Sequence, residues 1–184
     1  MNWEGTDGKR TSAKVPSTLY YEDKDKPPKW GFLVPPEVKS LKWFKLLLLE
    51  DADLRPDVHE SKYIKEARET LRTLGKSAVQ VVADYLRALW QHTLKEMVIN
   101  DGSGAVDGAA FRVVITLPAI WPTYAQNRMY QAASEAGITA RRHGGETKLD
   151  FYTEPEAAAL AIMQDARGQA VVVSVVQIVQ SFYC

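Results

Sequence analysis

The segment from Phe111 to Asp165 decides the fold of this chain. It opens with Phe-Arg-Val-Val-Ile-Thr-Leu-Pro-Ala-Ile-Trp-Pro at residues 111–122, and Leu-Asp-Phe-Tyr-Thr-Glu-Pro-Glu-Ala-Ala-Ala follows at residues 149–159. The first part is a β-rich run that ends at Pro118. Its uninterrupted apolar core, Val113–Ile115, is typical of a strand buried on both faces. The pattern predicts a strand, a helix, a second strand and a second helix.

The residues between the two predicted strands have the pattern of an amphipathic helix. Thr123 and Gln126 have the spacing of a capping box, and Gly137 is expected to end the helix. After the second strand, Asp150–Thr153, we expect Pro155 at the first position of an alanine-rich helix that runs to about Met163. The apolar positions of the first helix fall on one face: Ala125, Met129, Ala132, Ala133 and Ala136.

Two strands joined by one helix are expected to be parallel, with a right-handed crossover. This geometry places Leu117-Pro118 and Thr153-Glu154 side by side at the carboxyl edge of the sheet. Open α/β sheets bind ligands at this edge, close to helix N-termini. Glu154 is therefore the first candidate for a site residue. The alternative is that Glu154 only interacts favourably with the dipole of its own helix.

The rest of the chain adds elements around this α/β unit. Val15–Tyr21 and Lys29–Leu33 predict a hairpin with a long loop, and Leu41–Leu49 fits either a strand or a short helix. The remaining predicted elements are a helix over residues 60–74 ended by Gly75, a helix from the Ser77–Gln80 capping box to about Met97, loops at Asn100–Ala109 and Thr139–Lys148, and a buried strand at Ala170–Val179.

Composition and charge exclude several classes of partner. The chain has 184 residues, an apolar fraction of 46% and a formal net charge of +0, so bulk electrostatics favour neither nucleic acid nor an anionic membrane. No apolar run approaches the ~20 residues that a membrane-spanning helix needs. A single cysteine, Cys184, excludes an internal disulfide. These features predict a cytoplasmic protein, with the nucleus as the other default location.

Other candidate sites have weaker support. The glycines at 102, 104 and 108 and the pair Gly144-Gly145 match no phosphate-binding motif and precede the predicted strands, so we expect them to form turns. The three histidines, His59, His92 and His143, lack the ligand spacing of a zinc site.

The two β–α junctions resemble paired signatures of the heat shock protein 70 family. Val-Ile-Thr-Leu-Pro-Ala at residues 114–119 and Glu-Pro-Glu-Ala-Ala-Ala at residues 154–159 are most similar to a divergent branch of that family. Four upstream segments are similar to motifs of the branch in the same order: residues 14–21, 30–31, 43–48 and 83–87. The resemblance implies a partial actin-like ATPase (ribonuclease H-like) fold, which is α/β with a mixed sheet and flanking helices.

The resemblance also implies an ATP site that uses magnesium. Lys45 matches the family's lysine near the γ-phosphate, which stabilises charge on the transferring group and orients the attacking water. Glu154 matches the carboxylate that contacts the water shell of the magnesium ion. Pro118 matches a proline that relays the nucleotide state to the rest of the chaperone. Each residue also has a simpler interpretation: Lys45 as a surface lysine, Glu154 as an acid at a helix N-terminus, and Pro118 as the residue that ends a strand.

The chain also departs from the family pattern. The family's arginine after that proline has no clear counterpart, because Gln126 lies near its place and Arg128 is two positions away. The family grips phosphate with two glycine-threonine hairpins, each built around an aspartate. The first would lie upstream of Met1, and no aspartate, glycine or threonine follows Val179.

These departures predict a partial nucleotide-binding domain, the first lobe, at residues 1–165 and a divergent or truncated strand and tail at residues 166–184. ATPase activity of this chain alone is expected to be unmeasurable, because both phosphate-binding hairpins are missing. Loss of even one such set of hydrogen-bond donors typically lowers the rate by about 10²–10³.

Two hypotheses for the function follow. The first is a chaperone-type ATPase domain that binds ATP and magnesium, with unfolded clients and co-chaperones as partners. The second is a non-catalytic pseudo-ATPase or interaction fragment, or a truncated gene product. Both leave the oligomeric state open.

Overall fold

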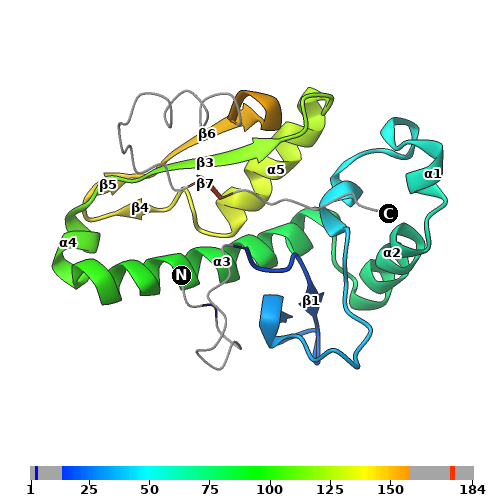
Figure 1. The fold of residues 1–184 in the computed structure, drawn as a ribbon, viewed down its shortest axis with the longest axis horizontal. Helices are drawn as coiled ribbons and strands as arrows, with labels where there is room; N and C mark the ends of the chain where they lie inside the picture. The colour runs from blue at the N-terminus through cyan, green and yellow to red at the C-terminus, as the bar shows by residue number, and fades with distance from the viewer. Residues whose placement is uncertain (1–2, 4–13, 158–174, 177–184) are drawn as a thin grey trace.

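The structure of the chain, a computed structural model, describes residue 3, residues 14–157 and residues 175–176 (Figure 1). Its elements are β1 (Leu19–Tyr20), β2 (Lys29–Trp30), η1 (Gly31–Leu33), η2 (Phe44–Leu48), η3 (Asp51–Asp53), α1 (Pro56–His59), α2 (Lys62–Leu74), α3 (Ala78–Asp101), α4 (Ser103–Gly108), β3 (Arg112–Leu117), α5 (Thr123–Glu135), β4 (Arg141–Arg142), β5 (Gly145–Glu146), β6 (Lys148–Thr153) and β7 (Val175–Val176). A further helix begins at Glu154.

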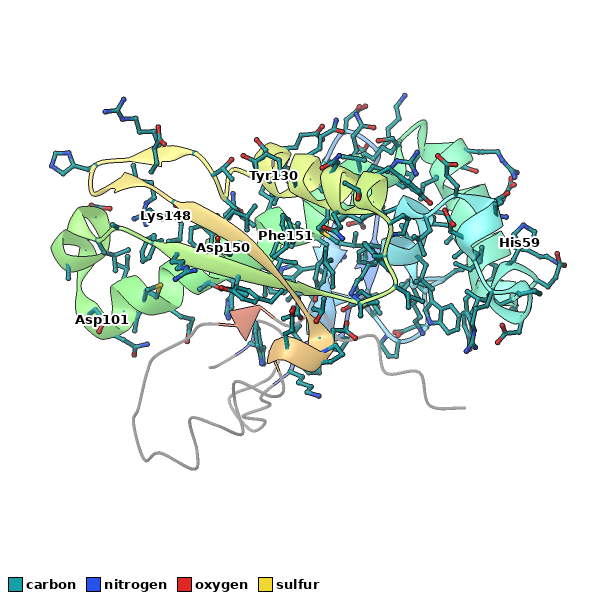
Figure 2. All side chains as sticks on the ribbon, turned by 90° about the horizontal axis from the view of Figure 1, so that it is seen from above. His59, Asp101, Tyr130, Lys148, Asp150 and Phe151 are labelled. Carbon is teal, nitrogen blue, oxygen red and sulfur yellow. The ribbon has the colours of Figure 1, made fainter. Side chains whose placement is uncertain are left out.

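Three strands form a parallel sheet with the order β6-β3-β7. β3 and β6 pair over their full length, and α5 connects them (Figure 1), so the predicted strand–helix–strand unit is confirmed. Figure 2 shows Lys148, Asp150 and Phe151 in succession along β6. β7 lies within the segment Ala170–Val179 that was predicted to be a strand.

The predicted α/β class is confirmed, but parallel and antiparallel pairings do not share one mixed sheet in the described residues. Antiparallel pairing occurs in two separate pairs, β1–β2 and β4–β5. On its other side, Leu19 of β1 forms an antiparallel bridge with Leu41, with Leu41 N–H donating to the Leu19 carbonyl at 2.7 Å. Every helix among the described residues is too short or too polar to cross a membrane.

α3 runs along the sheet and organises the core (Figure 1). Its predicted capping box is present: the Gln80 side chain accepts from Ser77 N–H at 2.8 Å, and the Ser77 hydroxyl accepts from Gln80 N–H at 3.1 Å. One hydrophobic cluster contains buried residues of the first hairpin, α3, the sheet and α5. Its most deeply buried side chains include Leu19, Phe44, Leu48, Tyr85, Leu86, Ile115 and Met129.

The C-terminal end of α2 follows the sequence prediction, its start lies two residues after the predicted residue 60, and the start of α5 differs from its prediction. Ser61 caps α2 through Ile64 N–H, and Gly75 ends it in the left-handed region with φ 65°. In α5 the capping position is Pro122, whose side chain has no atom that can accept a hydrogen bond. Thr123 is the first helical residue. The predicted Thr123–Gln126 capping box is therefore wrong. The Gln126 side chain instead donates to the Trp121 carbonyl at 3.1 Å.

Three predicted loops or ambiguous segments have a definite structure. Leu41–Leu49 contains the short 3₁₀ helix η2, and the predicted loop Asn100–Ala109 is mostly helical because α3 extends further and α4 follows. The polar loop before β6 forms the β4–β5 hairpin, in which Gly144 lies in the predicted turn and Gly145 is already the first residue of β5. A Cβ on Gly144 would lie 2.5 Å from the carbonyl oxygens of Gly108 and Ala109, so only glycine fits there.

Some predictions concern residues that the structure does not describe. The predicted helix after Ala157 and the boundary between residues 165 and 166 lie outside the described residues. The division into a first lobe and a tail thus remains a prediction.

Candidate functional site

The carboxyl ends of β3 and β6 lie next to each other, as the sequence predicted. Leu117 and Thr153 are partners in the parallel register. Pro118 and Glu154 therefore follow two neighbouring strand ends at one edge of the sheet. In open α/β proteins this edge is where ligands bind.

A capping box opens the helix that follows β6. The Glu156 carboxylate accepts from the backbone N–H of Thr153 at 2.9 Å and from its hydroxyl at 2.8 Å, and Glu156 N–H donates to that hydroxyl at 3.3 Å. These bonds make Thr153 the cap and Glu154 the first helical residue, so Pro155 occupies the second position rather than the predicted first. The bonds to Thr153 also hold the pKa of Glu156 below its ordinary value.

Lys45 reaches this edge of the sheet from η2. Its Nζ lies 3.6 Å from Glu154 Oε1, an ion pair that is longer than a hydrogen bond. The Lys45 side chain is 6% exposed and that of Glu154 is 39% exposed. Two residues that the family resemblance singled out separately are thus brought together, and the alternative of a surface lysine is wrong.

Burial dominates the electrostatics of Lys45. Loss of solvent lowers the pKa of its ammonium group, and the Glu154 carboxylate acts in the opposite direction without restoring the ordinary value. The ammonium group also lies 5.4 Å from the centre of the Trp121 ring, at a distance where the ring face attracts a cation. A further anion, such as a phosphate oxygen, would favour the charged form of Lys45.

The turn after β3 places Trp121 beside Lys45. Pro118 ends the strand, and its carbonyl accepts from Trp121 N–H at 3.1 Å. Trp121 is 5% exposed, whereas the adjacent Ile120 is 84% exposed. The predicted role of Pro118 as a relay of the nucleotide state remains a prediction.

α5 contacts the chain segment that follows Lys45. Arg128 Nη1 donates to the Leu48 carbonyl at 2.8 Å, and its Nη2 lies 3.2 Å from a Glu50 carboxylate oxygen. Gln126, the other position considered for the family's arginine, contacts the turn at Trp121. The two side chains thus contact different parts of the site.

Asp84, in the motif-like segment at residues 83–87, has a structural role away from this site. Its carboxylate accepts from Tyr21 Oη at 2.8 Å and pairs with Lys76 and Arg87 at 2.7 Å each. Burial and the nearby Asp84 charge raise the pKa of Tyr21. A surface hollow of about 370 Å³ beside these residues is lined by Gly75, Lys76, Gln80, Ala83, Asp84, Arg87 and Glu135.

The donor set beside Glu154 fits a phosphate group and an indirectly held magnesium ion. Lys45 provides a buried cation, and the half-exposed Glu154 carboxylate reaches solvent. Within residues 3, 14–157 and 175–176, no cluster of three or more His, Cys, Asp or Glu side chains is placed to hold a metal. Magnesium keeps several of its waters in proteins, so one carboxylate fits a contact through such a water.

Sequence reasoning missed the contacts that surround Lys45. Nothing in the local pattern around Trp121 indicated a lysine partner. A signal did exist for Tyr124 and Arg128, because residues four positions apart share one face of a helix. Their partner segment could not be predicted, since it lies far away in the sequence.

Comparison with known proteins finds relatives that this chain matches over only part of their length. The chain is 30% identical over 171 residues to Heat shock 70 kDa protein 12A of Homo sapiens and 29% identical over 171 residues to that of Mus musculus. Each alignment covers 86% of this chain and 23% of the relative, so the chain spans less than a quarter of these proteins. No protein-family model matches the chain. No solved structure is significantly similar to it.

Proposed function

Because the chain is a relative of the divergent heat-shock-70-like proteins, we propose that it forms part of an ATP-binding lobe with an actin-like ATPase fold. Lys45 and Glu154 are the residues that would face the phosphates. The observation that carries this proposal is their ion pair, with 3.6 Å between Nζ and Oε1, at the carboxyl edge of a parallel sheet.

Each residue has a role that its surroundings support. The Lys45 ammonium group, held between Glu154 and Trp121, would bind a γ-phosphate oxygen. The Glu154 carboxylate, which reaches solvent, would accept a hydrogen bond from a water on magnesium. ATP with magnesium, when bound, supplies the transferable phosphoryl group and a cation that neutralises its charge. The buried Trp121 would exclude bulk water from one side of Lys45.

The role of the complete protein is a wider proposal. The curated relatives are named as heat shock proteins, and the resemblance supports a chaperone-type ATPase whose partners are unfolded clients and co-chaperones. A cytoplasmic location agrees with this role. The alternative, a non-catalytic pseudo-ATPase or interaction fragment, predicts that the described site binds no nucleotide.

Calorimetric titration of the 184-residue chain with ATP and magnesium tests the proposal. We expect millimolar or tighter binding, weakened roughly tenfold or more by Lys45→Ala and by Glu154→Gln, because each variant removes one charged partner. Lys39→Ala is the matched control, since Lys39 forms an ion pair of the same 3.6 Å length with Glu66 but its side chain is 66% exposed.

The possible outcomes separate the hypotheses. Absence of binding by the unaltered chain would overturn the proposal and support the non-catalytic alternative. Binding that survives both site variants would place the nucleotide elsewhere. Equal weakening by Lys39→Ala would show a general charge effect, and it would also contradict the proposed site.

A further inference from the structure

Two side chains on one face of α5 meet the segment that carries Lys45. Tyr124 and Arg128 are four residues apart, which places them on adjacent turns of the helix. The Arg128 guanidinium lies 4.7 Å from the centre of the Tyr124 ring, within the range of a cation–π contact. The two side chains therefore form one unit, which we call the α5 clamp.

Arg128 provides the first half of the clamp. Its Nη1 donates to the carbonyl of Leu48, the last residue of η2, at 2.8 Å, and its Nη2 pairs with Glu50 at 3.2 Å. The last carbonyls of a helix lack partners within the helix, so this bond satisfies a group that would otherwise need water. The planar guanidinium group presents separate N–H groups to the two acceptors in a fixed geometry, whereas a lysine would offer a single flexible ammonium group.

Tyr124 provides the second half. Its hydroxyl accepts from the backbone N–H of Glu50 at 2.9 Å and donates to the Asp53 carboxylate. Asp53 ends η3, which directly follows Glu50. The clamp thus contacts the chain at three successive points after Lys45, from the end of η2 to the end of η3.

The other end of η2 also has a restrained geometry. Trp43, which precedes it, has φ 59° and is the one non-glycine residue with positive φ in the described part of the chain. Such a backbone conformation persists where the surroundings impose it. The Trp43 ring lies 5.1 Å from that of Tyr63, so α2 contacts η2 at the end opposite to the clamp.

From this geometry we infer that Arg128 and Tyr124 are positioning residues, which hold η2 so that the Lys45 ammonium group remains between Glu154 and Trp121. Neither side chain is assigned a contact with nucleotide. The link to ATP rests on the proposed function, whereas the positioning of Lys45 does not. A burial cost opposes the charged lysine at this place, so without the clamp its side chain would turn towards solvent.

The position of Lys45 can be measured without nucleotide. In protein labelled with ¹³C at lysine Cε, the Lys45 signal is expected to stand apart from those of exposed lysines, since its ammonium group lies over the Trp121 ring. The variant Lys45→Arg assigns the signal by removing it. We expect Arg128→Met to move this signal towards the exposed group, and Tyr124→Phe to move it less, because the ring remains.

Arg112→Met is the matched control. Arg112 is an exposed arginine paired with Asp150 at 2.6 Å, at the amino end of β3 and away from Lys45. We expect no movement of the Lys45 signal in this variant. If Arg128→Met does not fold, the Lys45 signal of Tyr124→Phe alone tests the inference. This variant removes only one hydroxyl group and is expected to fold.

A second measurement links the clamp to ATP. We expect Arg128→Met to raise the dissociation constant for ATP with magnesium about tenfold or more, since small displacements of a binding group are costly. A Lys45 signal that stays in place in folded clamp variants overturns the inference, whatever the affinity. A moved signal with unchanged affinity overturns its link to ATP. Failure of the unaltered chain to bind ATP overturns the proposed function and leaves the positioning result standing.

Discussion

Lys45 combines a cost in stability with a proposed role in binding. An ammonium group with 6% of its side chain exposed has lost most of its water, and the Glu154 carboxylate at 3.6 Å is itself partly solvated. Buried ion pairs of this kind are often no more stable than apolar residues of similar size. The proposed binding role thus explains a lysine at this position better than a contribution to folding does.

Replacing Lys45 by methionine should therefore stabilise the fold. We expect Lys45→Met to raise the free energy of unfolding at pH 7 by about 1 kcal/mol, since Glu154 remains accessible to water. The pKa of Lys45 is lower in the folded chain than its ordinary value of 10.5. At alkaline pH below 10.5 the unfolded chain therefore holds more protons than the folded chain does. The free energy of unfolding of the unaltered protein rises with pH in this range.

The advantage of the variant should shrink between neutral and alkaline pH. Urea denaturation at pH 7 and near pH 10 measures both effects. A variant that is less stable than the unaltered chain at pH 7 would contradict this account of Lys45.

At the scale of elements, helix starts show how far spacing alone can predict. Ser77–Gln80 and Thr153–Glu156 both form capping boxes, whereas Thr123–Gln126 has the same spacing and does not. The difference lies in which residue has the extended backbone of a cap. Before α5 it is Pro122, with ψ 157°, and Thr123 lies inside the helix.

Matched substitutions should separate the true cap from the apparent one. We expect Ser77→Ala to lower the free energy of unfolding by about 1 kcal/mol, because it removes the acceptor for Gln80 N–H. Thr123→Ala should change it by less than about 0.5 kcal/mol or stabilise slightly, since alanine is the better helix former. Equal losses in the two variants, measured by urea denaturation, would refute this assignment of the caps.

Most elements near the site could be predicted because their signals are local. The alternation of β3, α5 and β6 follows from apolar runs and breakers, and the parallel register then brings Pro118 and Glu154 together. The position of Lys45 could not be derived in this way. Its burial depends on Trp121 and on the α5 clamp, and these contacts join segments whose sequence patterns carry no information about each other.

At the scale of the whole molecule, one hydrophobic cluster joins the first hairpin to the sheet. Leu19 of β1, Tyr85 of α3, Ile115 of β3 and Met129 of α5 are all buried members of it. Because these elements share their apolar contacts, the hairpin should not unfold independently of the α/β unit.

Leu19→Ala tests this expectation. Leu19 is 0% exposed, so its truncation should lower the free energy of unfolding by about 2–5 kcal/mol. The transitions seen by tryptophan fluorescence and by far-ultraviolet circular dichroism should shift together to lower urea concentration. Two separated transitions, with the sheet surviving the loss of the hairpin, would show that the core is divided.

The residue-by-residue pairing of β3 with β6 limits how this chain can vary in length. One inserted residue within β6 would move Glu154 along the strand by about 3.3 Å and turn the alternation of its side chains to the opposite face. An insertion at the tip of the β4–β5 hairpin would leave that pairing unchanged. Selection is therefore expected to conserve the number of residues in β6 more strictly than their identity.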